Sequence, residues 1–393
     1  MVKIERLKEI DNYLHSIPEI GLQEYETANY IRKILKKNGI FFEEVANTGT
    51  LVYFEGQEKN ILAFRADIDA LPLADNSNHS SPSKKKGCSH ACGHSGHTSA
   101  LLETILEIKE ILDSGMKLKK SLLFIFQPGE EGFAGAKIVI KDKNFKKYLN
   151  DIEGFYATHL RPEIEEGVIG INTGPMSAQN INIKWDIEGK GSHGAYPHMG
   201  IDIVVITSEL IGAYQTIRSR NVHPADMYLF TIGKFFTGSK IDGKFKPGGA
   251  RNIIPNNIEL EGTIRMYDKK YIEISKERIE KINKGFEEAY EIKINMHFEP
   301  KYPPMINDEK LSNNIRLVAE NLNIKIIKEN KTTGSEDFSF FGDIAPTFMF
   351  ATGVKNKELG HVSGLHNPKF GYDVKALKNI VKIYLKLIEN EYI

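Results

Sequence analysis

The sequence predicts an α/β protein in which a domain with a mixed, mostly parallel sheet flanked by helices is interrupted by an inserted ferredoxin-like α+β domain. Two observations predict this fold class. Apolar runs alternate with segments of helical periodicity early in the chain, and the order of elements changes near residue 178. At 393 residues the chain is also too long for one ordinary core. We therefore expect one domain from 1–178 and 300–393, and an inserted domain from 179–299.

In the first domain, apolar residues at three- and four-residue spacing predict helices over 3–16, 23–38, about 97–114 and 374–391. Short apolar runs predict buried strands at 51–54, 61–64 and 122–126. The segment 73–89 is polar and rich in Ser and Lys, which is typical of a surface loop. Alternating strands and helices of this kind indicate a largely buried sheet.

In the inserted domain, the predicted elements are a strand (181–188), a helix (201–219), two strands (227–235 and 257–265), a helix (268–289) and a strand (291–299). This β-α-β-β-α-β order is that of the ferredoxin-like arrangement. Residues 237–251 are rich in Gly and Lys, so we expect a flexible hairpin loop there.

The overall composition excludes several classes of partner. Lys+Arg and Asp+Glu both total 52, so there is no basic excess of the kind that nucleic acids or anionic membranes require. The N-terminal segment is charged and amphipathic rather than a signal peptide, and no apolar run is long enough to span a bilayer. Only two cysteines are present, which leaves no disulfide framework and fits a reducing cytoplasm.

Four potential metal ligands lie within eight positions: His90, Cys92, His94 and His97. Thiolate and imidazole are the ligands that zinc and its neighbours prefer. A closed structural zinc site would need more cysteines than Cys92 and its neighbour Cys88. The remaining ligands must come from elsewhere in the chain, as they do in catalytic sites.

Further candidates follow apolar strands or lie in loops. Glu130 and Glu131 come directly after the run 122–126, where one carboxylate can bind metal while the other acts as a base, although a solvated acidic turn is the simpler reading of such a pair. His159 and His366 are each weak signals, since histidines occur in cores and loops without a function. Together these residues supply the inventory of a two-metal hydrolytic centre.

His193 lies in the inserted domain, in the run Gly189–His198 between a predicted strand and a predicted helix. A histidine there cannot easily bind a metal in the other domain of its own chain. It is suited to donate a hydrogen bond to an oxyanion that develops on a substrate.

The chain resembles the aminoacylase and carboxypeptidase-G group of metallopeptidases, and within it the amidohydrolase branch that includes hippurate hydrolases and N-acetyl-diaminopimelate deacetylases. The resemblance runs nearly end to end. Besides His159 and His366, its motifs are Leu14–Ile20, Phe64–Pro72, His90–His94, Gln127–Glu131, Gly191–His198, Arg251–Pro255 and Gly334–Phe338. So many motifs in the family's order make a specific signal.

The resemblance implies two divalent metal ions per subunit, zinc or manganese first and cobalt or nickel as alternatives. The metal ligands that it implies are Cys92, His94, Glu131, His159 and His366. It assigns Glu130 as the general base that takes a proton from the attacking water.

The resemblance also implies a lid and dimerisation role for the inserted domain. His193, supplied by the partner subunit of a homodimer, would stabilise the tetrahedral intermediate, and Asn252 would contact the substrate. For Asp67 and Asp69 we expect a supporting role behind the metal ligands.

Two positions depart from the resemblance. Ser95 stands where the family usually has Asp, and this loss is expected to loosen His94 or to alter the metal preference. Cys88 is also unusual. It is either a harmless surface thiol or a partner for a disulfide with Cys92 that would disable the site.

The implied activity is metal-dependent hydrolysis of the amide bond of N-acyl amino acids. Two alternatives stay open: a dipeptidase or carboxypeptidase with the same chemistry, and a non-catalytic metal-binding paralogue. The presence of Glu130 and His193 argues against the second. A zinc-stabilised structural domain fails because the ligands are scattered along most of the chain.

Overall fold

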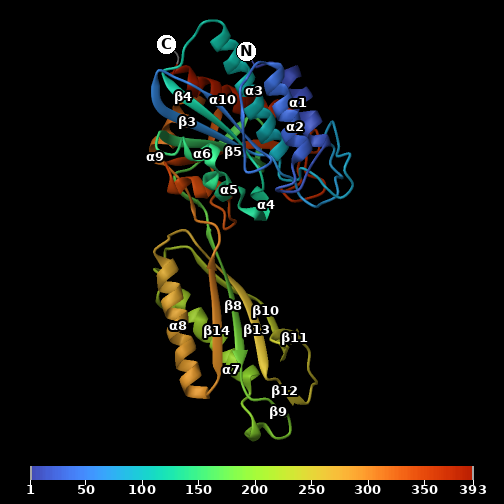
Figure 1. The fold of residues 1–393 in the computed structure, drawn as a ribbon, viewed down its shortest axis with the longest axis vertical. Coiled ribbons are helices and arrows are strands. Elements are labelled where there is room, and N and C mark those ends of the chain that lie inside the picture. The colour runs from blue at the N-terminus through green and yellow to red at the C-terminus, as the bar shows by residue number, and fades with distance from the viewer. Residues whose placement is uncertain (1, 392–393) are drawn as a thin grey trace. The chain divides into compact units, whose positions relative to one another are not determined.

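The computed structural model describes residues 2–391, which form two compact units (Figure 1). The first, which we call the α/β unit, comprises Met1–Met176, Met305–Lys331 and Asp337–Ile393. The second, the inserted unit, comprises Ser177–Pro304 and the short segment Thr332–Glu336. No helix within residues 2–391 combines the length and the apolar character needed to cross a membrane.

The α/β unit is built on a ten-stranded sheet in the order β1-β2-β4-β3-β5-β17-β15-β7, with β6 and β16 off this path. Its strands are β1 (Glu43–Val45), β2 (Gly49–Phe54), β3 (Glu58–Asp67), β4 (Lys120–Gln127), β5 (Ile152–Glu165), β6 (Val168–Ile171), β7 (Gly174–Ser177), β15 (Met305–Asn307), β16 (Lys325–Lys328) and β17 (Thr347–Lys355). The pairs from β4 through β3, β5 and β17 to β15 are parallel, whereas β1–β2 and β2–β4 are antiparallel. The predicted mixed, mostly parallel sheet with flanking helices is thus confirmed.

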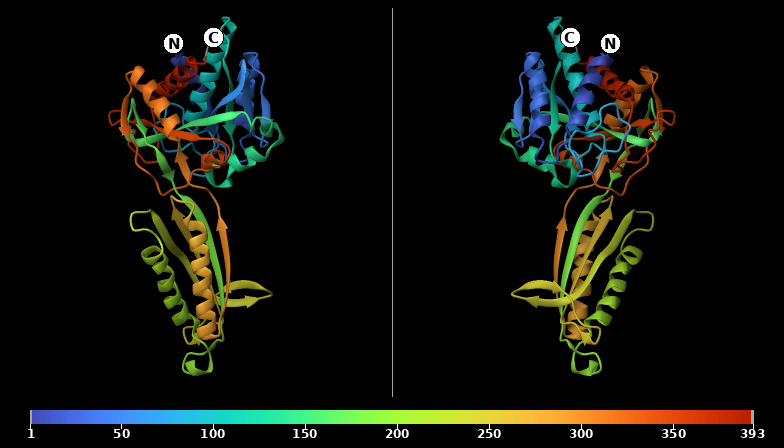
Figure 2. Two further views of the ribbon diagram at one scale, coloured as in Figure 1. Left: turned by 90° about the vertical axis from the view of Figure 1, so that its left-hand side faces the viewer. Right: turned by 90° about the vertical axis from the view of Figure 1, so that its right-hand side faces the viewer.

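Helices cover the two hydrophobic clusters of this sheet. They are α1 (Ile4–Ser16), α2 (Tyr25–Lys37), α3 (His94–Asp113), α4 (Glu130–Phe133), α5 (Gly135–Lys141), α6 (Lys143–Lys146), α9 (Glu309–Asn321) and α10 (Lys378–Glu389). α1 and α10 come from opposite ends of the chain and both pack against α3 (Figure 2). Because strand β4 is covered on both faces, its apolar run Leu122–Phe126 is completely buried, which is why that strand reads as a continuous apolar run.

The register of the parallel strands brings polar side chains to one edge of the sheet. Asp67, the last residue of β3, pairs with Gln127, the last residue of β4. On the other side of β3, Arg65 pairs with Ala157 of β5. Asp67 and His159 each lie two residues further along their own strand. Carboxyl ends of parallel strands are where open α/β sheets carry their ligand sites.

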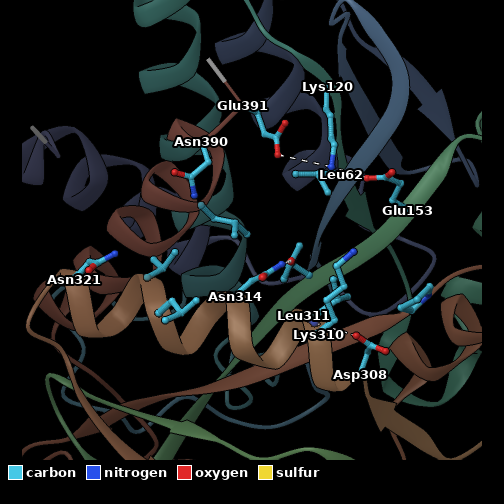
Figure 3. A pocket seen from close by; sticks show the side chains of 15 residues that line it. Leu62, Lys120, Glu153, Asp308, Lys310, Leu311, Asn314, Asn321, Asn390 and Glu391 are labelled. Carbon is cyan, nitrogen blue, oxygen red and sulfur yellow. Dashed lines mark hydrogen bonds and ion pairs between the residues drawn. The ribbon is translucent and has the colours of Figure 1, made fainter. Parts of the chain in front are cut away.

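A cavity of about 640 Å³ lies at the opposite edge, where these strands begin (Figure 3). Leu62, Lys120 and Glu153 contribute to its wall from the first halves of β3, β4 and β5, and α9 and α10 supply most of the rest. The Lys120 ammonium pairs with Glu153 at 2.8 Å. None of the residues expected to bind metal lines this cavity.

The inserted unit contains a five-stranded sheet in the order β11-β10-β13-β8-β14. Its principal elements follow each other as β8 (Gln179–Glu188), α7 (Ile203–Arg220), β10 (Tyr228–Ile241), β11 (Lys244–Pro247), β13 (Asn257–Met266), α8 (Tyr271–Tyr290) and β14 (Lys293–Pro300). All of its strand pairs are antiparallel. Burial alternates strictly along β8, as expected for a strand with one face on a core, and Trp185 stacks there on Tyr214.

The hairpin expected within 237–251 is present, but paired strands rather than a loop make up most of that segment. Strand β10 continues to Ile241 and pairs with β11 in a hairpin that projects from the body of the inserted unit (Figure 2). Asp242 and Gly243 form its tip with φ angles of 51° and 72°. An Asp-Gly pair with two positive φ angles is the signature of a tight hairpin turn, which composition alone did not reveal.

Candidate metal centre

The His/Cys cluster lies at the start of α3. Gly93 precedes the helix in the left-handed conformation, with φ of 85°, and a Cβ at this position would approach the Leu160 side chain to 2.9 Å. The helix therefore starts at His94, three residues before the predicted start. As a result His94 and His97 project from the first helical turn instead of from a loop.

The five side chains predicted to bind metal come together in the α/β unit. Three groups have ligand atoms that all lie within 4.8 Å of one another: Cys92 with His94 and His159, Cys92 with Glu131 and His366, and His94 with Glu130 and Glu131. Cys92, His94 and Glu131 each belong to two of these groups, so the three groups form one continuous cluster. Its members come from four separated segments of the chain.

Glu131 and His366 form an ion pair, with 3.1 Å between Glu131 Oε1 and His366 Nε2. The backbone holds both residues in place. Glu131 donates its N–H to Asp69 Oδ2 at 2.9 Å, and His366 donates its N–H to the Ala91 carbonyl at 2.8 Å from a left-handed conformation. Gly129 and Ala134 bound the short helix α4 with positive φ angles, and its first two residues, Glu130 and Glu131, both bring a carboxylate oxygen within 4.8 Å of a His94 ring nitrogen.

The chemistry of these groups fits a divalent cation. His94 Nε2 is buried and makes no hydrogen bond, while Nδ1 of the same ring lies 3.0 Å from the Asp69 carbonyl. Burial, reinforced by Arg161, holds the pKa of His159 well below its usual range, so this ring is neutral and keeps a lone pair for a cation. Thiol, imidazole and carboxylate together suit zinc, manganese, cobalt or nickel.

Burial raises the pKa of the Cys92 thiol to about 12 in the metal-free protein. Cys92 Sγ lies 3.6 Å from His159 Nε2. Since a thiol binds metal as the thiolate, metal binding at Cys92 has to release a proton.

Two buried aspartates stand behind the cluster. Asp69 contacts His94 through Oδ1 at 3.2 Å and accepts from the Glu131 backbone, so one carboxylate touches two of the expected ligands. Asp67 Oδ2 accepts from Arg65 at 2.8 Å. Burial raises the pKa of Asp67, but His94, Arg65 and His97 outweigh it and hold this pKa well below its usual range.

The other two histidines of the sequence cluster differ from His94. His90 is buried and belongs to none of the groups of potential ligands. His97 Nδ1 contacts Asp67 Oδ1 at 2.7 Å, and its Nε2 accepts from the Leu160 backbone at 2.9 Å. From the sequence, His97 is expected only as a group able to bind metal, and the roles of Arg65 and Leu160 are not predicted, because no spacing rule connects these residues.

The departure at Ser95 has a structural explanation, whereas nothing in the structure explains Cys88. Ser95 Oγ lies 3.1 Å from His15 Nδ1 and 2.8 Å from Tyr372 Oη, so its contacts lead away from His94, whose ring Asp69 holds. Cys88 is half-buried, and it and Cys92 are both free thiols.

His193 and Asn252 lie together in the inserted unit. Strand β9 (Ser192–His193) pairs with β12 (Ile253–Ile254), and Gly194 donates its N–H to the Asn252 carbonyl at 2.7 Å. His193 is exposed, and its Nδ1 accepts from the Ala195 N–H at 3.1 Å. In the neutral ring the proton is therefore on Nε2, which leaves Nε2–H as an outward donor.

Residues 63–390 match the family model described as Peptidase family M20/M25/M40. An N-acetyl-L-cysteine deacetylase of Bacillus subtilis (strain 168) is 35% identical over 370 residues, covering 94% of this chain and 84% of the relative. An uncharacterized hydrolase of Staphylococcus saprophyticus is 32% identical and covers 99% of this chain and 98% of its own length. The crystal structure of the YxeP protein of Bacillus subtilis, described as a dinuclear metal binding peptidase, matches with a TM-score of 0.82 at 27% identity, covering 98% of this chain and 97% of that one.

Proposed function

The chain belongs to peptidase family M20/M25/M40 and is a metal-dependent amidohydrolase, and from this premise we propose that it hydrolyses the amide bond of N-acyl amino acids. The products would be a carboxylic acid and a free amino acid. The observation that carries the proposal is the convergence of Cys92, His94, Glu131, His159 and His366 into one cluster beside Glu130. The deacetylase relative supports an N-acyl substrate.

In the proposed mechanism, two divalent cations held by these five residues would polarise the substrate carbonyl and lower the pKa of water. Glu130 takes a proton from the attacking water as the new C–O bond forms. Glu130 then delivers this proton to the amide nitrogen, and the C–N bond breaks. His193 donates its Nε2–H to the carbonyl oxygen as that oxygen becomes negative, and Asn252 contacts the bound substrate.

We place this reaction in a homodimer in which His193 serves the site of the partner subunit. Apolar side chains around His193 support an interface in the inserted unit: Tyr196, Met199, Val205 and Ile253 are all between 55% and 60% exposed. Large exposed apolar residues gathered in one region mark interaction surfaces.

Mixing two inactive variants tests this arrangement. Glu130→Gln and His193→Ala subunits that exchange at random should together regain about a quarter of the wild-type activity, because half of the dimers then hold one intact site. No recovery, from subunits shown by sedimentation to have exchanged, would contradict a His193 that acts across the interface.

Release of free amino acid, detected with ninhydrin, tests the activity itself. The panel comprises N-acetyl and N-benzoyl amino acids, with N-acetyl-L-cysteine included because of the deacetylase relative, in reducing buffer with added zinc or manganese. We expect release that disappears in Glu130→Gln. Dipeptides form the second arm: cleavage of dipeptides alone would favour the peptidase alternative, and no release from folded, metal-loaded protein would favour a non-catalytic paralogue.

Free thiols at both cysteines support the proposal of a reducing compartment, the cytoplasm.

A further inference from the structure

We infer that Asp67 and His97 are positioning residues: together with Arg65 they hold the backbone of Leu160, whose carbonyl in turn orients the His159 ring. The inference rests on the proposed metal centre, because His159 is one of its ligands. It assigns His97 a role other than metal binding, although His97 lies in the sequence cluster that indicated the site.

The chain of hydrogen bonds is anchored at Arg65, which is 2% exposed. Its guanidinium donates to Asp67 Oδ2, Asp337 Oδ1 and Gln127 Oε1, at 2.8 Å in each case. Such a group is always protonated, so it has only donors to offer. Because Arg65 binds Oδ2 of Asp67, Oδ1 is the oxygen that is left to accept a hydrogen bond from His97.

Two contacts determine the tautomer of His97. The Leu160 backbone N–H donates to His97 Nε2 at 2.9 Å, so Nε2 carries a lone pair. The proton of the neutral ring is consequently on Nδ1, which donates to Asp67 Oδ1 at 2.7 Å. Both ring nitrogens are used, which leaves His97 no lone pair for a cation even though it lies within reach of Asp67 and His94.

The next peptide unit, which carries the Leu160 carbonyl, orients the metal ligand. The Leu160 carbonyl lies 2.8 Å from His159 Nδ1, and since a carbonyl only accepts, Nδ1 must carry the proton. His159 Nε2 is then left with a lone pair, 3.6 Å from Cys92 Sγ. The residue that His97 holds by its N–H is thus the residue that sets the tautomer of His159.

His159 donates to the Leu160 carbonyl, the Leu160 N–H donates to His97, and His97 donates to Asp67, to which Arg65 donates from the other side. Groups that hold a metal-binding histidine fix its ring and raise its basicity. His97 is 2% exposed and Asp67 is fully buried, so water does not compete with these bonds. Loss of any member should displace or weaken His159 as a ligand.

Asp67→Asn disrupts these hydrogen bonds while it hardly changes the shape of the side chain. If the amide oxygen faces His97, the amide NH₂ opposes the donor of Arg65. If the NH₂ faces His97, the proton must move to Nε2, where it opposes the Leu160 N–H. Asp11→Asn is a matched control, since Asp11 is also fully buried and pairs with a histidine, His79, at 3.0 Å.

The first test uses metal-free protein with nitrogen-15-labelled histidine. For the wild type we expect His97 and His159 both to carry the proton on Nδ1, and for Asp67→Asn a changed tautomer or mixed signal at His97. The wild-type spectrum tests the inference even if the Asp67→Asn variant does not fold. A wild-type His97 protonated on Nε2 or on both nitrogens would overturn the inference.

The second test measures zinc affinity by competition with a chelator. We expect Asp67→Asn to weaken binding about 10- to 100-fold and Asp11→Asn to leave it within about threefold of the wild type. Equal affinities for Asp67→Asn and the wild type, or equal losses in both variants, would overturn the inference. Failure of the wild type to bind zinc at all would instead overturn the proposed metal centre.

Discussion

The two units differ in what they bury. The α/β unit encloses charged and titratable side chains, among them Asp11, Asp67, Asp69, His94 and His159. In the inserted unit, the buried polar side chains of residues 177–304 are neutral (Ser177, Gln179, Thr207, Asn257, Ser275 and Asn283), and Glu336 in the short second segment is the buried charged side chain among the described residues of this unit. Buried charge is costly unless it is paired, so its concentration in one unit marks where chemistry rather than stability has selected the residues.

The two units also differ in how they hold their functional groups. In the α/β unit buried residues hold four of the candidate ligands: Asp69 contacts His94 and Glu131, Leu160 contacts His159, and Ala91 contacts His366. In the inserted unit His193 is exposed on a two-stranded ladder, and its ring contacts the nearby residues Ala195 and Tyr196. We therefore expect changes in the first unit to alter metal binding, and changes in the second to alter either activity alone or the fold of that unit alone.

The largest effect should follow from Cys92→Ala. Loss of a shared ligand should lower the activity about 10³-fold or more and reduce the metal content, because bound cations supply several kcal/mol of transition-state stabilisation. Activity assays and the metal-to-protein ratio check this. Cys88→Ala is the matched control, since Cys88 is the other free thiol, and it should keep its activity with or without reductant. Protection of the enzyme by Cys88→Ala under oxidising conditions would revive the disulfide hypothesis.

Trp185→Ala tests the core of the inserted unit. Trp185 is fully buried and stacks on Tyr214 and Phe230, so the substitution should cost about 3–5 kcal/mol. Hydrogen exchange should show lost protection within 177–304 while the α/β unit keeps its protection and its metal. Uniform loss of protection in both units would show that the two cores are not separable.

His193→Ala should lower kcat about 10²- to 10³-fold, the usual effect of removing one oxyanion donor. Metal content and the unfolding temperature should match the wild type, since His193 is exposed and its ring contacts Ala195 and Tyr196 of its own unit. Kinetics, metal analysis and thermal unfolding of the same sample give the three values. A parallel loss of metal would place His193 among the ligands and remove the distinction between the units.

Glu329→Gln tests buried charge in the α/β unit through pH. Burial raises the pKa of Glu329 from 4.5 to about 7, although Arg161 lies 3.4 Å away. The unfolded chain loses this proton first as pH rises, so the wild type loses stability between 4.5 and about 7, by roughly 1–3 kcal/mol. The variant lacks this loss. Its unfolding temperature relative to the wild type should therefore rise across that window, and a constant difference would contradict the shifted pKa.

Ser95→Ala should have the smallest effect on metal affinity. The variant loses the contacts with His15 and Tyr372 and should be destabilised by about 1 kcal/mol. Its zinc affinity should stay within about threefold of the wild type, because Asp69 rather than Ser95 holds the His94 ring. A larger change in affinity or in metal preference would support the expectation drawn from the sequence.

The parts of the fold that could be predicted are those that leave a local pattern of apolar residues in the sequence. The run Leu122–Phe126 indicates a buried strand, and apolar spacing indicates the helices that became α1, α2 and α8. Less predictable were features fixed by one backbone angle, such as the Asp242–Gly243 turn and the start of α3 after Gly93. A windowed pattern averages over such single residues.

For the site, the resemblance supplied the cluster, and the geometry supplied what surrounds it. Cys92, His94 and Glu131 belong to motifs, and the structure brings them together. The roles of Arg65 and His97 were not predictable, because their partners are set by strand register: His97 meets the backbone of Leu160, 63 residues away. Because the donor is a backbone N–H, which nearly every residue type has, no sequence motif marks this contact.

Anomalous scattering from crystals grown with zinc tests the central claim most directly. The account predicts two peaks in the α/β unit, liganded by Cys92, His94, Glu131, His159 and His366, and none between Asp67 and His97. A peak liganded by Asp67 and His97, or no peak at the cluster despite bound zinc in solution, would contradict it.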